Sequence, residues 1–190
     1  MSWEEPFKER EKGQEAHYFQ QRERELRASA REEQQRARDL EDLSTLTGIE
    51  DAQLLGALVA GEIRPDNAAA FDLMPMLRLA WADGPPSQHQ QQAIRREAEL
   101  RGIHGASPGR ALLEQWLLAA PAQATTELWG RYARARCVRL DGTARELFHH
   151  ALVRRARAIA RKRWSVLGLG FGVSRAAAAV LAELERPFQV

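Results

Sequence analysis

The residue spacings that suggest metal or thiol chemistry are few in this chain. Glu146 and His149 form one Glu-x-x-His pair, the i, i+3 spacing of metal ligands in di-iron helical bundles, but the sequence has no second pair of this kind. A helical projection places His149 among apolar residues, so we expect a core or boundary histidine rather than a ligand. The single cysteine, Cys137, excludes an intramolecular disulfide and a cysteine-rich zinc site, and a buried thiol is expected.

A second group of residues could bind anions. The net charge of +2 is the sum of −3 for residues 1–43, −3 for residues 44–106 and +8 for residues 107–190. In a helix predicted over residues 143–163, an apolar arc lies opposite an arc of five cations, namely Arg154, Arg155, Arg157, Arg161 and Lys162. This face is either the solvated side of a bundle helix or a site for an acidic protein, an anionic membrane or nucleic-acid phosphate. Sequence-specific nucleic-acid recognition is not expected, since no aromatic residues suited to base stacking accompany the cations.

The N-terminal arm, residues 1–46, is predicted to be one long charged helix. Glu, Gln, Arg and Ala dominate it, and opposite charges recur at helical spacing. Phe19, Leu26 and Leu40 share one heptad position, but Glu33 occupies the same position between them. The seam is therefore weak, and we expect a solvated helix that docks only along its C-terminal half or against a protein partner or a second copy. Phe19, Leu26 and Leu40 are the residues expected to contact that partner.

Residues 47–190 are predicted to form a compact bundle of about seven helices, which makes the fold class all-α. The spacing predicts a buried helix over residues 65–82, kinked at Pro75. Capping boxes are expected at Ser87 with Gln90 and at Thr143 with Glu146, and Ser174 is expected to cap the last helix. In the helix that begins at Pro108, Leu118 is among the residues expected to face inward.

One stretch resembles the tellurite-resistance TerB-like helical family. It is the apolar run Leu73-Met74-Pro75-Met76-Leu77-Arg78-Leu79-Ala80-Trp81-Ala82-Asp83-Gly84, followed by a Ser-capped helix. Gly172-Val173-Ser174 is a second, similar turn, and the resemblance covers roughly residues 47–186. It implies an all-helical fold, no catalytic activity, and a role in stress response or in interactions near the membrane.

The resemblance also implies a metal role for acidic residues at the turn, of which only Asp83 carries over. Pro85, Gln90 and Gly170 stand where the family often has acidic residues. From the residues alone, Asp83-Gly84 is a turn-forming pair, because the two prolines that follow leave few oxygen ligands for a hard cation. No cofactor is therefore expected, with a divalent metal at Asp83 as the alternative.

The expected function is a non-enzymatic interaction module that acts through protein contacts, and the alternative is an anion-binding protein that uses the basic helix. The 190 residues contain no apolar run of the roughly 20 residues that span a bilayer. The start, Met1-Ser2-Trp3-Glu4-Glu5, is acidic, unlike a signal peptide. A cytoplasmic location is expected, either in solution or peripheral to the inner face of the membrane.

Overall fold

The computed structural model describes residues 5–139, 141–144, 146 and 174–186, with side chains from residue 17 onward. Within these ranges the chain is helical and has no strand, which confirms the all-α fold class. The long N-terminal helix, α1, spans Glu5–Thr47. Contacts divide the chain into two units, residues 1–41 and residues 42–190, and each unit is described by itself.

Helix α1 ends at a glycine whose backbone adopts the left-handed conformation. Gly48 has φ +71°, a conformation that costs little only without a Cβ atom, and its N–H donates to the carbonyl of Ser44 at 2.8 Å. The Ser44 hydroxyl donates to the carbonyl of Ile49 at 2.8 Å, and the Ile49 side chain is buried. The last turn of α1, which already belongs to the compact unit, therefore has its carbonyls partly satisfied and is followed by a buried apolar residue, Ile49.

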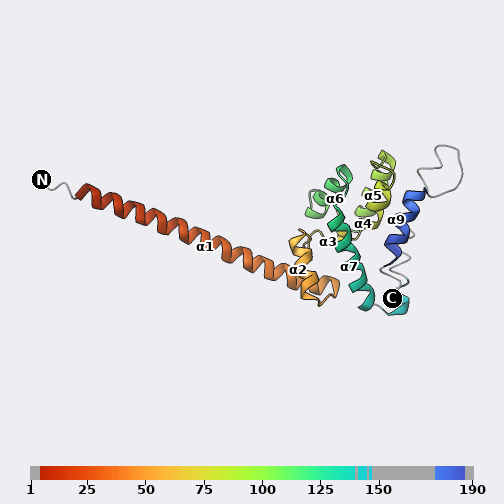
Figure 1. The fold of residues 1–190 in the computed structure, drawn as a ribbon, viewed down its shortest axis with the longest axis horizontal. Coiled ribbons are helices and arrows are strands. Elements are labelled where there is room, and N and C mark those ends of the chain that lie inside the picture. The colour runs from red at the N-terminus through yellow and green to blue at the C-terminus, as the bar shows by residue number, and fades with distance from the viewer. Residues whose placement is uncertain (1–4, 140, 145, 147–173, 187–190) are drawn as a thin grey trace. The chain divides into compact units, whose positions relative to one another are not determined.

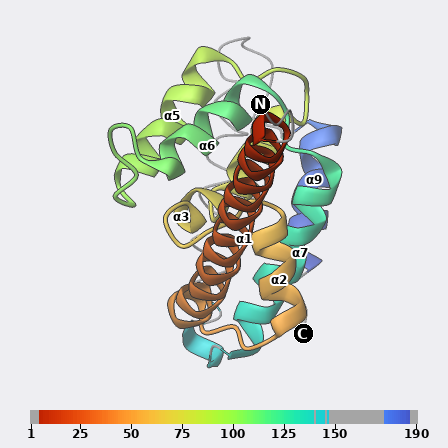
Figure 2. The ribbon, with the colours of Figure 1, turned by 90° about the vertical axis from the view of Figure 1, so that its left-hand side faces the viewer.

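The compact unit, residues 42–190, is built from short helices (Figures 1 and 2). Four packing contacts organise the described part, α3 with α6, α4 with α9, α2 with α7, and α4 with α5. Because α4 contacts both α5 and α9, it is the central element. The described helices are α2 (Ala52–Ala60), α3 (Ala68–Phe71), α4 (Met74–Trp81), α5 (Gln88–Glu99), α6 (Pro108–Leu118), α7 (Gln123–Arg139) and α9 (Arg175–Glu185).

Aromatic residues fill the centre of the compact unit. The Phe71 ring is fully buried and lies 5.3 Å from the ring of Tyr132 and 6.4 Å from that of Trp116, measured between centroids. The indole N–H of Trp81 donates to the carbonyl of Trp116 at 2.9 Å. Helices α3, α4, α6 and α7 therefore meet in one apolar core, where a buried aromatic side chain removes a large area from water.

Polar N-caps begin several of these helices, as the sequence predicts. The Ser87 hydroxyl accepts a hydrogen bond from the N–H of Gln90, and the side-chain oxygen of Gln90 accepts one from the N–H of Ser87. The predicted capping box is therefore confirmed. Ser174 caps α9 by accepting from the N–H of Ala177, which is also confirmed. These caps satisfy N–H groups that have no partner within the helix.

The single kinked helix predicted over residues 65–82 is wrong. The structure has two helices, α3 and α4, separated by Asp72 and Leu73, and Pro75 lies in the first turn of α4. A proline lacks the backbone N–H that an interior helical residue donates to the preceding turn. In the first turn of a helix this N–H has no acceptor within the helix, so its absence costs little. Starting a new helix at Pro75 therefore costs less free energy than bending a continuous helix at that residue.

Two further local predictions are wrong. The helix predicted to be capped at Thr143 is already helical at residue 142, and Asp141 caps it by accepting from the N–H of Ala144 at 2.7 Å. A carboxylate two residues earlier takes the capping role from the Thr143 hydroxyl. Leu118, expected to face inward, is 83% exposed at the last position of α6.

Candidate functional site: the exposed segment of α1 and the Asp83 turn

The first candidate site is a stretch of α1 that we call the exposed segment, residues 17–38. Every residue in it is exposed, including three large apolar or aromatic side chains, Tyr18 (64%), Phe19 (67%) and Leu26 (61%). The rings of Tyr18 and Phe19 lie 6.0 Å apart in an edge-to-face contact. The third residue predicted to bind a partner, Leu40, follows the segment and is half-buried. Two of the three predicted contact residues are thus accessible.

The polar contacts of the exposed segment are local. Arg27 forms an ion pair with Glu23 at 2.6 Å, and Arg22 forms one with Glu25 at 3.5 Å. Both pairs join residues one helical turn apart, and more than half of each side chain is exposed. Such pairs contribute roughly 0–1 kcal/mol each, so they support the helix without fixing the segment against another surface.

The second candidate site is the turn after α4, where Asp83 and Ser174 meet. The Ser174 hydroxyl lies 2.8 Å from each oxygen of the Asp83 carboxylate and donates its hydrogen to that carboxylate. The hydroxyl oxygen of Ser174 also accepts a hydrogen bond from the N–H of Ala177. Gly84, with φ +106°, lets the chain turn directly after the carboxylate. The Asp83 turn and the N-cap of α9 therefore contact each other across 91 positions of the chain.

A second polar contact joins the same two helices. Arg78 of α4 donates to Glu183 of α9 at 3.0 Å, so α4 and α9 run antiparallel, and α9 has a polar contact near each of its ends. Ala177, Leu181 and Leu184 are the buried residues of α9. The turn at Asp83 thus belongs to the clasp that holds α9 on α4.

The arrangement at Asp83 has a bearing on the metal hypothesis. A divalent cation such as Ca²⁺ or Mg²⁺ prefers six or more oxygen ligands, usually with several carboxylates. In the part of the chain that the structure describes, no group of three or more His, Cys, Asp or Glu side chains could hold a metal ion. Metal binding by Asp83 stays a prediction, and a hydrogen bond from Ser174 is the role that the geometry gives this carboxylate.

Sequence reasoning missed a part-buried polar cluster between α7 and the α3–α4 turn. The Tyr132 hydroxyl donates to Asp72 at 2.9 Å, and Arg136 donates to the Tyr132 oxygen at 2.9 Å and to both Asp72 oxygens at 3.3 Å. Burial, more than the neighbouring Asp72 charge, raises the pKa of Tyr132, so the phenol stays protonated near neutral pH. A sequence signal did exist, since Tyr132 and Arg136 are one turn apart on α7 and Asp72 interrupts an apolar run.

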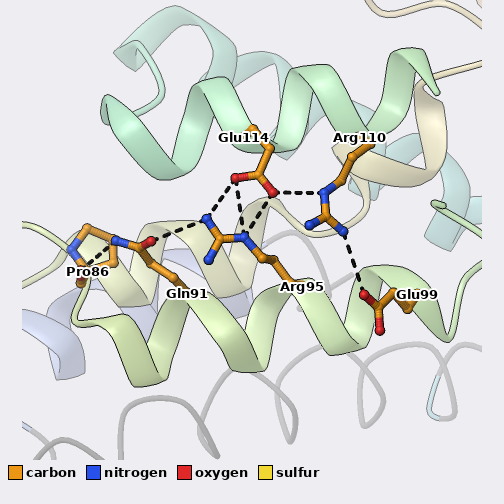
Figure 3. A network of polar contacts seen from close by, with 6 residues as sticks. All are labelled: Pro86, Gln91, Arg95, Glu99, Arg110 and Glu114. Carbon is orange, nitrogen blue, oxygen red and sulfur yellow. Dashed lines mark hydrogen bonds and ion pairs between the residues drawn. The ribbon is translucent and has the colours of Figure 1, made fainter. Parts of the chain in front are cut away.

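A second missed network joins α5 and α6, which lie side by side (Figures 2 and 3). Arg95 donates three hydrogen bonds to Glu114, at 2.7, 2.9 and 3.3 Å, and Arg110 contacts the same carboxylate at 2.8 Å. Arg110 also lies 3.8 Å from Glu99, and Gln91 links Arg95 to the carbonyl of Pro86. The hydrogen bond from Arg95 lowers the pKa of Glu114, and burial opposes this only in part.

The network therefore ties two helices together and moves the pKa of Glu114 away from neutral pH. A general acid or base needs a pKa close to the operating pH, whereas this arrangement moves the Glu114 pKa away from it. We take the network as structural support for the compact unit.

Several predicted residues lie outside the part that the structure describes. These include His149, and the cations expected to bind anions, which are Arg154, Arg155, Arg157, Arg161 and Lys162. Cys137 is described and is fully buried, which confirms the expectation of an interior thiol. None of the described helices is both long enough and apolar enough to cross a membrane.

Comparison with known proteins adds no relative. No protein-family model, no curated protein and no solved structure matches this chain. The TerB-like resemblance thus rests on the Asp83-Gly84 turn and its neighbouring helices alone and stays a prediction, and the function has to be argued from the surfaces described above.

Proposed function

We propose that this chain is a non-enzymatic helical interaction module of the TerB-like type that acts through protein–protein contacts, with the exposed segment of α1 as its docking element. The observation that carries the proposal is the exposure of Phe19 and Leu26 on a helix that is exposed at every residue from 17 to 38. A role in stress response comes from the resemblance only.

The exposed segment leaves the apolar side chains of Phe19 and Leu26 in contact with water. Burying a Phe or Leu side chain is worth about 1.5–3 kcal/mol, and within the chain the exposed segment gains none of this. Single exposed apolar residues are ordinary on protein surfaces. Phe19 and Leu26, however, lie two turns apart on one side of the same helix, which is the spacing of a contact with another helix or groove.

The chemistry of the described clusters supports a non-enzymatic role. The Asp72–Tyr132–Arg136 cluster holds a tyrosine whose pKa burial raises, and the network around Glu114 holds a carboxylate whose pKa is lowered. Catalytic acids and bases have the opposite tendency, with pKa values moved toward neutrality. Both clusters instead hold separate helical elements together, the first between α7 and the turn at Asp72 and the second between α5 and α6.

The test compares full-length variants purified from the native host at low salt. Phe19→Asp with Leu26→Asp changes the two apolar side chains, and Gln20→Asp with Ala28→Asp introduces the same charges at exposed positions on another side of the helix. We expect a co-purifying protein to be lost from the first variant and retained by the control. Binding to the exposed segment is then measured again with the purified components.

Two results would overturn this proposal. The first is equal recovery of the protein partner by both variants. The second is recovery of lipid or nucleic acid, but no protein, by the unmodified chain and both variants, which would assign function to the basic residues 154–162 instead. Binding of that kind would weaken steeply as the salt concentration rises.

A further inference from the structure

In α1 the seven-residue repeat includes basic, acidic and alanine positions as well as the apolar ones. A column here means the residues that lie seven positions apart. In one column each residue is basic, in the next most are acidic, in a third most are large and apolar, and in a fourth most are alanine. The columns are His17, Arg24, Arg31, Arg38; Tyr18, Glu25, Glu32, Asp39; Phe19, Leu26, Glu33, Leu40; and Ala16, Glu23, Ala30, Ala37.

A strict seven-residue repeat has a physical meaning for a helix. A straight α-helix has 3.6 residues per turn, so residues seven positions apart do not lie exactly above one another. Their direction rotates around the helix axis by about 20° per heptad, and after a few heptads they no longer point at a straight neighbouring surface. The drift is cancelled when two helices wind around each other with a left-handed twist, and the partner must then have the same period. The apolar column and the alanine column occupy the two positions, three or four residues apart, that form the seam of such a pair.

We propose that the exposed segment pairs with the same segment of a second copy of this chain, as an antiparallel two-helix coiled coil. This inference rests on the proposed function and names its partner. A second copy supplies a helix of matching period and composition, and every residue from 17 to 38 is exposed. The pairing is symmetric, so one patch on each copy contacts the same patch on the other.

The sizes of the seam residues select the antiparallel direction. When two such helices run in opposite directions, each large residue faces a residue of the alanine column. With the two-fold axis near Ala28, Phe19 faces Ala37 of the second copy and Leu26 faces Ala30 of the second copy. Large against small fills the seam evenly, whereas a parallel pair stacks leucine on leucine and alanine on alanine and leaves gaps at the alanine layers.

In this register, acidic residues of the two copies face each other within the seam. Glu23 faces Glu33 of the second copy, which is unfavourable for a bare pair of carboxylates. Arg27 already bonds Glu23 at 2.6 Å, and Arg22 and Arg36 are the neighbours that reach this level from the two helices. The acidic layer is thus surrounded by cations, which reduces its cost but does not remove it. Replacing the acid by an apolar residue should strengthen the pair.

The first experiment measures the mass of the full-length chain by sedimentation over a range of concentrations. We expect a reversible dimer for the unmodified chain, a monomer for Leu26→Asp, and an unchanged dimer for Ala28→Asp, which places the same charge on the outer side of the helix. Glu33→Leu should lower the dissociation constant by about tenfold or more, since it adds an apolar layer and removes the acid pair.

Either of two sedimentation results would overturn the inference. One is a monomer for the unmodified chain at every concentration up to its solubility limit. The other is equal loss of the dimer in Leu26→Asp and Ala28→Asp. The proposed function fails separately. A chain that is always monomeric, but that still captures a different protein through Phe19 and Leu26, would refute self-pairing and leave the docking role intact.

The second experiment determines the direction of the two helices with spin labels. Labels are attached at His17→Cys or Ala28→Cys, and the natural Cys137 stays unlabelled because it is fully buried. In the antiparallel pair, the two labels at residue 17 are separated along the axis by about 33 Å and those at residue 28 by almost nothing, from the rise of ~1.5 Å per residue. Equal distances at both sites would overturn the antiparallel arrangement.

Discussion

The exposed segment of α1 and the compact unit use the same kinds of residue in different ways. In the exposed segment, polar side chains contact neighbours one turn away, as Arg27 contacts Glu23. In the compact unit, polar side chains contact residues far along the chain, as Arg95 contacts Glu114 and Ser174 contacts Asp83. The comparison teaches that local ion pairs can support a helix, but only long-range contacts fix it against another element.

The largest expected difference between the two regions comes from one substitution made in each. Leu77→Ala in α4 removes a fully buried side chain, and we expect the free energy of unfolding to fall by about 2–5 kcal/mol. Leu26→Ala in the exposed segment should change it by less than about 0.5 kcal/mol. Urea unfolding followed by tryptophan fluorescence, at protein concentrations too low for self-association, measures both. Similar losses for the two variants would contradict the comparison.

The polar cluster on α7 should show the next largest effect. Asp72→Ala leaves Arg136 and the Tyr132 hydroxyl without their shared acceptor, and we expect a loss of about 2–3 kcal/mol in the same urea experiment. Tyr132→Phe removes only the hydroxyl and keeps the Asp72–Arg136 pair, so it should cost less, about 1 kcal/mol. If Tyr132→Phe costs more than Asp72→Ala, the carboxylate is not the centre of the cluster.

The Ser174 cap should give a smaller and local effect. Ser174→Ala removes the acceptor for the Ala177 N–H and the donor to Asp83, with an expected loss of about 1 kcal/mol and faster hydrogen exchange across α9. Ser29→Ala, in the exposed segment, is the matched control and should leave exchange in the compact unit unchanged. Unaltered exchange in α9 of Ser174→Ala would show that the clasp on α4 does not depend on this serine.

The smallest effect concerns pH. Because the folded state lowers the pKa of Glu114 below its usual 4.5, the charged carboxylate contributes stability that is present above that value and is lost as the pH falls through the folded pKa. Unfolding free energies measured from about pH 7 down to about pH 3 should therefore decline less steeply for Glu114→Gln than for the unmodified chain. Glu127→Gln, at an exposed acid of α7, is the control and should follow the unmodified profile.

Local signals in the sequence predicted the helices better than the contacts between them. The Ser87–Gln90 box and the Ser174 cap were predictable because a cap depends on residues three positions apart. The break at Pro75 was misjudged because an interior kink and a new helix start share the same proline signal. Leu118 was misjudged because its position at the last turn of α6 is not visible in an apolar run.

The candidate site divides in the same way. Phe19 and Leu26 could be singled out from the sequence, since a heptad spacing is a property of one helix, and the structure shows that both side chains are exposed. Their contact with a partner stays a prediction. The meeting of Asp83 with Ser174, and of Asp72 with Tyr132, could not, because each joins residues at least 60 positions apart. Nothing in the local sequence at Asp83 indicates that a serine of another turn will donate to its carboxylate.

The amino-acid sequence by itself determined that this protein is all-α, that a long charged helix precedes a compact bundle, and where many helices begin. These are consequences of helix propensity, apolar period and capping, all of which act within a few residues. Only the tertiary structure decided that α9 is held against α4, that Asp72 joins Tyr132 and Arg136 of α7, and that every residue from 17 to 38 is exposed. Those outcomes depend on which apolar faces bury each other, and that choice is made by the whole chain at once.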